Sequence, residues 1–509
     1  METEAGRKLS LTGLLVGFIA GLPQLFFPIL AVLYGAGNSD RGLLLMPVLI
    51  FGLLAASLLF RWISWMRFAY YVGHEDIRIE SGLLNRSARS IPYERIQDVG
   101  IEQKPLARLF GLSEVKLETG SGSGDEAKLS YVTMIEAERL RTLVRAHKSG
   151  VIVVPSPANA AAETERDDAA PPIFAMNIAR VLTLGFYSFS LVILAILGGL
   201  AQQFDFLLSF DLYDIDAWRD SAKNNGYVID AVSRSARIFA GVAALFGLIV
   251  IGFATGIIRT FLREYGFRLD VSPRGFRRRR GLLTLTDVVM PIHRVQAATI
   301  YTGPIRKRRG WHGLKFISLA GDSDKAQKGD SDHIVAPLAN LAEIERILTA
   351  AKIDPAGPDV IFLRGRPAWW LVQLMAAGLV IIAGIIALIV AADAGWKAML
   401  LLALLPLALG SAFLQWRFSL YAVDGDNLLV CGGWWQQRMT IAPQIKIQTA
   451  EISQGPVARF FGLCKIHFGI AGGTLSISAL RISEARLIAA QVIERVAALD
   501  YSEISAPKI

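Results

Sequence analysis

The stretch IPYERIQDVGIEQKPLARLFGL, residues 91–112, decides the fold of this chain because its pattern occurs three times. It is too polar and too interrupted by proline to cross a bilayer. Segments that begin at Gly82, Gly281 and Gly433 fit one template without a gap: Gly, nine residues, Pro, four residues, Gln, seven residues, Pro, five residues, Gly. The template residues are Gly82, Pro92, Gln97, Pro105, Gly111; Gly281, Pro291, Gln296, Pro304, Gly310; and Gly433, Pro443, Gln448, Pro456, Gly462. The chain is therefore predicted to contain three copies of one module.

A basic residue also recurs three positions after the first proline of each copy, as Arg95, Arg294 and Lys446. We expect these signature residues to be mainly structural. The glycines and prolines set turns, and the glutamines satisfy backbone groups.

Each copy reads as a β-rich domain. Short runs rich in Val, Ile, Thr and aromatic residues, such as IRIESG and VKLETG, are bounded by Gly, Ser or Asp, which is typical of half-buried antiparallel strands. Each copy then closes with an amphipathic segment, for example TMIEAERLRTLVRAHK. The pattern predicts a small, bent β-sheet or barrel followed by a C-terminal helix.

The composition indicates an integral membrane protein. Of the 509 residues, 53% are hydrophobic and only 19% are charged, and the mean hydropathy is +0.42. Long apolar runs come in couples, at about 10–34 with 42–65, 178–201 with 236–262, and 368–392 with 396–416. Each is close to the ~20 residues that a membrane-spanning helix needs. Six transmembrane helices in three pairs are predicted, each pair followed by one of the three domains.

The predicted boundaries follow from these runs. They are transmembrane pair 1 at 1–66, domain 1 at 67–150, a linker at 151–177, pair 2 at 178–262 with an acidic external loop at 202–235, domain 2 at 263–353, pair 3 at 354–416 and domain 3 at 417–509. Lys and Arg flank the runs on one side, and Asp gathers in the loop 202–235. The positive-inside rule therefore predicts a multi-pass protein of the bacterial cytoplasmic (inner) membrane, with both termini and all three domains in the cytoplasm.

The repeated pattern resembles the bacterial pleckstrin-homology-like (PH-like) domain of the membrane-flanked family, in particular members that place several such domains between paired helices. The likeness is strongest in IPYERIQDVGIEQKPLARLFGL and weakest in IAPQIKIQTAEISQGPVARFFGL, where Lys446 replaces the arginine. The resemblance implies two roughly orthogonal antiparallel sheets with a C-terminal helix, and a binding or scaffolding role.

Two basic clusters in the second copy are the candidate contacts with anionic lipid or a partner. They are Arg277, Arg278, Arg279, Arg280 and Arg306, Lys307, Arg308, Arg309. Guanidinium groups beside an anionic membrane surface bind phosphate well. The alternative is a solvated basic face without a pocket. The other copies carry Leu109 with Phe110, and Phe460 with Phe461, where the second has Arg308 with Arg309.

No catalytic set is apparent. The six histidines are scattered, the two cysteines Cys431 and Cys464 lack metal-ligand spacing, and no phosphate-binding loop occurs. We expect no enzyme activity, no metal and no cofactor. The net charge of +9 fits the lysine and arginine bias of cytoplasmic loops, so nucleic acid is not an expected partner.

The sequence thus predicts a non-enzymatic membrane protein whose PH-like domains bind or scaffold. The expected partners are membrane lipids and a protein, with another membrane protein of the same family as one candidate. The alternative is a six-helix transporter or exporter component with the domains as a cytoplasmic gate.

Overall fold

The computed structural model describes residues 7–26, 28–29, 32, 40–82, 87–119, 127–149, 171–189, 234–272, 275–318, 334–357, 359–392 and 405–498. Most of the predicted linker 151–177 and of the predicted acidic loop 202–235 lies outside these residues. The chain forms two compact units, one of residues 175–268 with 279–285 and one of the remainder.

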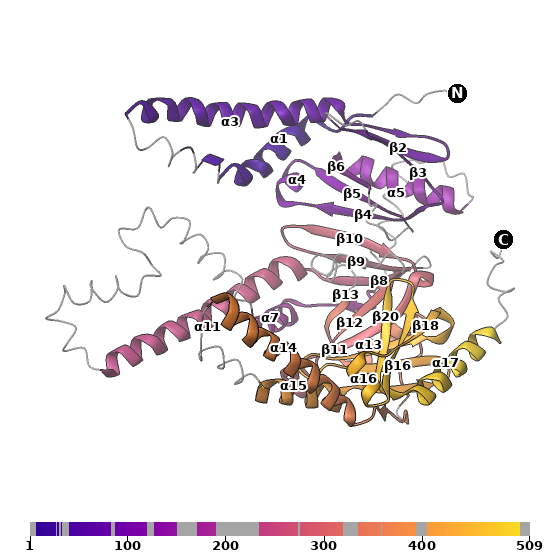
Figure 1. Ribbon diagram of the computed structural model, residues 1–509. Helices are drawn as coiled ribbons and strands as arrows, with labels where there is room; N and C mark the ends of the chain where they lie inside the picture. The colour runs from indigo at the N-terminus through magenta and orange to yellow at the C-terminus, as the bar shows by residue number, and fades with distance from the viewer. Residues whose placement is uncertain are drawn as a thin grey trace. The chain divides into compact units, whose positions relative to one another are not determined.

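The first domain consists of two three-stranded groups and a closing helix (Figure 1). Its elements are β1 (Ala69–Val72), β2 (Asp76–Ser81), β3 (Ser87–Pro92), β4 (Ile96–Gln103), α4 (Pro105–Leu109), β5 (Leu112–Thr119), β6 (Ala127–Thr133) and α5 (Met134–Ser149). Fully buried Ile77, Val115 and Leu117 bring both strand groups into one core, against which Leu140 of α5 packs. The predicted strands and the predicted closing helix are confirmed.

The other two domains repeat this order. The second has β8 (Arg268–Ser272), β9 (Gly275–Arg280), β10 (Leu285–Met290), η3 (Ile292–Arg294), β11 (Val295–Thr302), α12 (Pro304–Arg308), β12 (His312–Ser318), β13 (Ile334–Ala339) and α13 (Leu341–Ala350). The third has β15 (Leu420–Asp424), β16 (Asn427–Gly432), β17 (Gln437–Pro443), η5 (Gln444–Lys446), β18 (Ile447–Ser453), α16 (Pro456–Phe460), β19 (Leu463–Ile470), β20 (Gly473–Arg481) and α17 (Ile482–Ala497). Two-residue strands β7 (Phe174–Ala175) and β14 (Leu363–Arg364) precede them.

Neighbouring domains share their sheets, which the sequence did not lead us to expect. The strand orders are β6-β5-β4-β10-β9-β8-β7 and β13-β12-β11-β17-β16-β15-β14, so the fourth strand of one domain lies beside the third strand of the next. β11 pairs antiparallel with β17 from Ala298 opposite Ile441 to Thr302 opposite Gln437. Ala297 of β11 also belongs to the hydrophobic core of the third domain. A sheet edge left open by one domain is thus closed by the next.

Most of the template residues set turns or satisfy backbone groups, as expected. All six template glycines have positive φ, between 65° and 114°, a conformation that side chains with a Cβ rarely adopt. Pro105, Pro304 and Pro456 each open a one-turn helix, where the missing N–H has no cost. Buried Gln296 donates to the Arg294 carbonyl at 3.2 Å. Gln448 is exposed instead, and the side chain of Gln97 lies outside the described ones.

Three helices among the described residues are long and apolar enough to cross a membrane. They are α3 (Asp40–Arg67), α11 (Arg234–Glu264) and α14 (Ala368–Ala392). The other three predicted spans fall partly outside the described residues, where the helices α1 (Leu11–Gly21), α7 (Ile178–Phe186) and α15 (Leu405–Phe418) mark their described parts. Exposed Phe51, Phe246 and Val380 suit a lipid environment, because hydrocarbon is the solvent there.

The helices do form pairs. α1 packs on α3, α7 on α11 and α14 on α15. In the second pair small residues permit the close crossing: a Cβ added at Gly185 would lie 2.7 Å from the Ile257 Cα, and one at Gly256 would lie 2.1 Å from the Ser188 carbonyl oxygen. Close approach through glycine is typical of helix packing in membranes.

Candidate functional site

The first basic cluster is mostly buried, contrary to the expected surface contact. Arg277, Arg278 and Arg280 are 6%, 3% and 5% exposed. Arg277 binds the Asp287 carboxylate at 2.6 Å, Arg278 donates to the Ile334 carbonyl at 2.9 Å, and Arg280 binds Glu264 at 2.9 Å. These side chains hold β9 to its surroundings, and an inward-facing position that the sequence pattern did not reveal explains the difference.

One of these contacts also joins two domains. Arg141 on α5 of the first domain is 1% exposed and donates to the carbonyl oxygen of Asp287, on β10 of the second domain, at 3.0 Å. The Arg141 guanidinium lies 3.4 Å from the Asp287 carboxylate, which Arg277 contacts as well. A buried carboxylate between two guanidinium groups is therefore part of the domain junction.

The second basic cluster lies on α12 and its C-terminal end. Lys307, Arg308 and Arg309 are exposed and Arg306 is half-buried. Lys307 reaches across to the third domain and donates to Gln437 Oε1 at 2.8 Å. The exposed side chains of Lys307, Arg308 and Arg309 suit contact with an anionic surface.

The equivalent one-turn helices of the other domains present large apolar side chains. Leu109 at the end of α4 is 81% exposed and Phe460 at the end of α16 is 83% exposed. α4 packs beside α1 and α16 beside α14, the first helices of their own helix pairs. Exposed apolar side chains beside membrane helices suit insertion into the interfacial layer of a bilayer.

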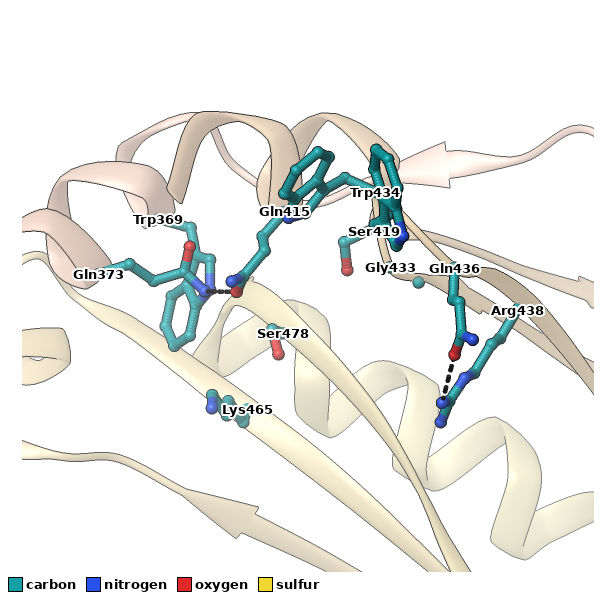
Figure 2. A pocket seen from close by; sticks show the side chains of 12 residues that line it. Trp369, Gln373, Gln415, Ser419, Gly433, Trp434, Gln436, Arg438, Lys465 and Ser478 are labelled. Atoms are coloured by element: carbon teal, nitrogen blue, oxygen red, sulfur yellow. Dashed lines mark hydrogen bonds between the residues drawn. The ribbon is translucent and has the colours of Figure 1, made fainter. Parts of the chain in front are cut away.

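A cavity of about 520 Å³ lies where the third helix pair meets the third domain. Trp369 and Gln373 of α14 and Gln415 of α15 line it from the helix pair (Figure 2). The domain contributes the turn between β16 and β17, with Trp434 and Trp435, and the side chains of Arg438, Lys465 and Ser478. The lining combines three tryptophans with two cationic groups.

The polar groups of this cavity are partly paired. Gln373 Nε2 donates to Gln415 Oε1 at 3.1 Å between the two helices, as the dashed line in Figure 2 shows. The other amide atom, Gln373 Oε1, is buried without a hydrogen-bond partner among the described residues. Lys465 Nζ lies 5.3 Å from the centre of the Trp369 ring, within cation–π range.

Hydrogen bonds and an ion pair hold the third helix pair to the third domain around the cavity. Just before α14, the Arg366 backbone N–H donates to the Ala479 carbonyl at 2.7 Å, and the Arg366 side chain binds Glu484 on α17. The Arg366 hydrogen bond and the Arg481 N–H together hold the pKa of Glu484 below its usual value. Trp416 Nε1 donates to the Gly365 carbonyl at 2.9 Å. The helix pair and the domain therefore present the cavity in a defined geometry.

The first repeat has a cavity at the equivalent place, of about 270 Å³. Gly13 and Gly17 of α1, Arg61 and Trp65 of α3, and Lys128, Ser130 and Tyr131 of β6 line it, together with Leu9, Leu14, Ser64 and Phe68. Tyr131 in β6 and Ala479 in β20 share a positive φ, 64° and 70°, directly after the lining serines Ser130 and Ser478. Because the same corner is hollow in two repeats, it follows from the architecture of the module.

Comparison with known proteins identifies this module. The bacterial PH domain matches residues 15–148, 228–352 and 373–496, which together make up more than half of the chain. The chain belongs to the bacterial PH domain family. The three predicted repeats and the predicted family are thereby confirmed.

A curated relative of this bacterial PH domain protein is the UPF0699 transmembrane protein YdbT of Bacillus subtilis (strain 168). The two are 25% identical over 313 residues, and the match spans 59% of this chain and 60% of the relative. No solved structure matches the chain.

Sequence reasoning missed the cavities of the bacterial PH domains, although one signal was present. Trp434 and Trp435 stand where the first two copies have leucines after the template glycine, and this departure marks the wall of the larger cavity. The described residues contain no group of three His, Cys, Asp or Glu side chains that could hold a metal ion. Cys431 and Cys464 are free thiols, and burial raises the pKa of Cys431 to about 11.

Proposed function

We propose that this protein is a non-enzymatic, multi-pass protein of the bacterial cytoplasmic membrane that binds anionic lipid headgroups and scaffolds partner proteins through its three PH domains. The cavity at the third helix pair is the observation that carries the proposal. Its lining has the composition of a membrane-interface site, with tryptophans at headgroup depth and cationic groups beside them.

The chemistry of the lining suits a phosphodiester with a hydroxylated or amino headgroup. Lys465 and Arg438 supply positive charge for the phosphate. Gln373 Oε1 lacks a donor among the described residues, and a headgroup hydroxyl or amine would provide one. The smaller cavity of the first repeat, with Arg61, Lys128 and Trp65, has the same combination.

The shared sheets support the predicted topology. Domains joined by backbone pairing, as β11 and β17 are, must lie on the same side of a membrane. An even number of crossings must then separate consecutive domains, which favours two spans in each of the two connections, that is, four of the six predicted spans. The alternative of a six-helix transport path stays a prediction, because no specific feature of the described residues favours it.

Shared sheets also suit scaffolding. Domains fixed side by side hold their binding surfaces at constant spacing, so a second contact forms at high effective concentration once the first is made. Exposed Leu109 and Phe460 on the one-turn helices would add contact with the lipid surface at two places along the array.

The lipid part of the proposal is tested by replacing Lys465 with alanine in the full chain. Loss of one cation near an anionic headgroup should weaken binding of phosphatidylglycerol about fivefold. It should weaken binding of phosphatidylcholine less, because the trimethylammonium group of that lipid offsets its phosphate charge. Native mass spectrometry of the purified protein with each lipid measures this. Arg486→Ala removes an exposed charge from α17 and is the matched control. Equal loss for both lipids, or no loss, would contradict the proposal.

A further inference from the structure

Each domain uses two particular strands to contact its neighbours. The fourth strand of the first domain, β4, lies beside the third strand of the second, β10, and likewise β11 lies beside β17. Among the described residues, the same two kinds of strand lie at the two ends of the array. β3, the third strand of the first domain, and β18, the fourth strand of the third domain, each end a three-stranded sheet. The chain thus carries both halves of a contact that it already makes twice within itself.

The exposed fraction of one aligned isoleucine shows which of the fourth strands are covered by a neighbouring domain. The template aligns Ile101, Ile300 and Ile452 on β4, β11 and β18. The first two are 2% and 8% exposed, whereas Ile452 is 37% exposed. On the other side, Ser87 to Ser90 of β3 are exposed, whereas the equivalent part of β17 is mostly half-buried or buried. An apolar residue kept on an uncovered sheet edge favours pairing with a further strand.

The register of the internal contact can be carried over to these two edges. Thr299 stands opposite Thr440 in the β11–β17 pair, and Ile300 stands opposite Met439. The template aligns Thr299 with Glu451 and Thr440 with Arg89, so a carboxylate and a guanidinium would stand directly opposite. In the same register Ile452 would face Ala88, and Ala450 would face Ser90. Opposite charges in directly facing positions stabilise strand pairs.

We infer that β18 of one molecule pairs antiparallel with β3 of a second copy, which extends the array head to tail. The occupant is a second copy because β3 has the position and exposure of the strand that the internal contacts use, and because Arg89 carries the charge opposite to that of Glu451. The contact joins two different surfaces, so it builds rings or filaments along the membrane rather than closed two-fold dimers.

Charge reversal tests the contact in the purified full chain in lipid nanodiscs or detergent. Glu451→Arg and Arg89→Glu should each reduce the fraction of assembled molecules about fivefold, because like charges would face one another. The chain that carries both substitutions should assemble as the unaltered protein does, since the pair is restored in reverse. Mass photometry over a range of concentrations measures the assembled fraction. Glu345→Arg, which reverses an exposed charge on α13, should leave it unchanged.

Disulfide formation tests the register. In chains whose Cys431 and Cys464 are replaced by alanine, Ile452→Cys and Ala88→Cys are introduced into separately tagged copies. Oxidation should yield a mixed disulfide that carries both tags, while Glu345→Cys in place of Ile452→Cys should yield none. A protein that remains monomeric at all concentrations, a double reversal that stays unassembled, or absence of the mixed disulfide would overturn the inference. An unassembled double reversal would point to a different protein as the occupant of β18.

Discussion

At the scale of single residues, burial separates side chains that the sequence presents as alike. Arg277 and Arg308 both sit in runs of basic residues, yet the first is 6% exposed beside Asp287 and the second is exposed on a one-turn helix. A charge taken out of water needs a partner of opposite charge, whereas a charge in water does not. The run Arg277 to Arg280 therefore contributes to folding, and of these two runs the one at 306–309 remains a candidate for anionic contact.

The buried pair gives a prediction about stability. Asp287→Asn should lower the free energy of unfolding by about 3 kcal/mol, because Arg277 and Arg141 would then lose the carboxylate that compensates them in the interior. Thermal unfolding of the purified protein in detergent measures the change. Asp426→Asn is the matched control, since Asp426 binds Arg495 at the same 2.6 Å but is 78% exposed. Its loss should be within about 0.5 kcal/mol. Equal effects of the two substitutions would refute the role of burial.

At the scale of elements, the sequence signature fixes local geometry through steric rules. The second template proline opens α4, α12 and α16 because its missing N–H needs no partner in a first turn. What these short helices present differs from repeat to repeat: Leu109 and Phe460 in two of them, and Arg308 in the third. The element is therefore common to the modules, while its surface chemistry distinguishes them.

The pairing of apolar helices gives a prediction at the same scale. Gly256→Ala should destabilise the α7–α11 pair by about 1–3 kcal/mol, because the new methyl group would meet the Ser188 carbonyl oxygen 2.1 Å away. Gly378→Ala on α14 meets nothing within 4 Å and should leave stability unchanged or slightly raised, since alanine favours helix. The midpoint of thermal unfolding in detergent compares the two. A lower midpoint for Gly378→Ala than for Gly256→Ala would contradict the close crossing.

At the scale of the whole molecule, the shared sheets turn three tethered domains into one array. Backbone hydrogen bonds between β11 and β17 cannot form across a bilayer, so we expect the domains that they join to share one compartment. The positive-inside rule predicts that this compartment is the cytoplasm.

Cysteine labelling tests this topology. In a chain whose native cysteines are replaced by alanine, the exposed positions Ile135→Cys, Glu345→Cys and Arg486→Cys place one reporter in each domain. A membrane-impermeant maleimide should label all three only after lysis of the cells. Lys223→Cys, in the predicted external loop 202–235, should react in intact cells. A reporter that behaves differently from the other two domain reporters would refute the common compartment.

The sequence by itself determined the module, its number and its order. The sequence patterns that showed this are the gapless template, the strand-like runs and the paired apolar runs. They follow from local rules of turn geometry, periodicity and hydrophobicity, and single residues such as Gly82, Gly281 and Gly433 display those rules.

Only the tertiary structure decided how the modules join and where their cavities lie. The partners of Arg277 and Arg141, the pairing of β11 with β17, and the meeting of Lys465 with Trp369 unite residues far apart in the chain. Such contacts depend on which sheet edges meet in space, and no local pattern encodes that. The strands β3 and β18, which end the sheets of the described residues, become informative for the same reason, because the equivalent strands make contacts elsewhere in the molecule.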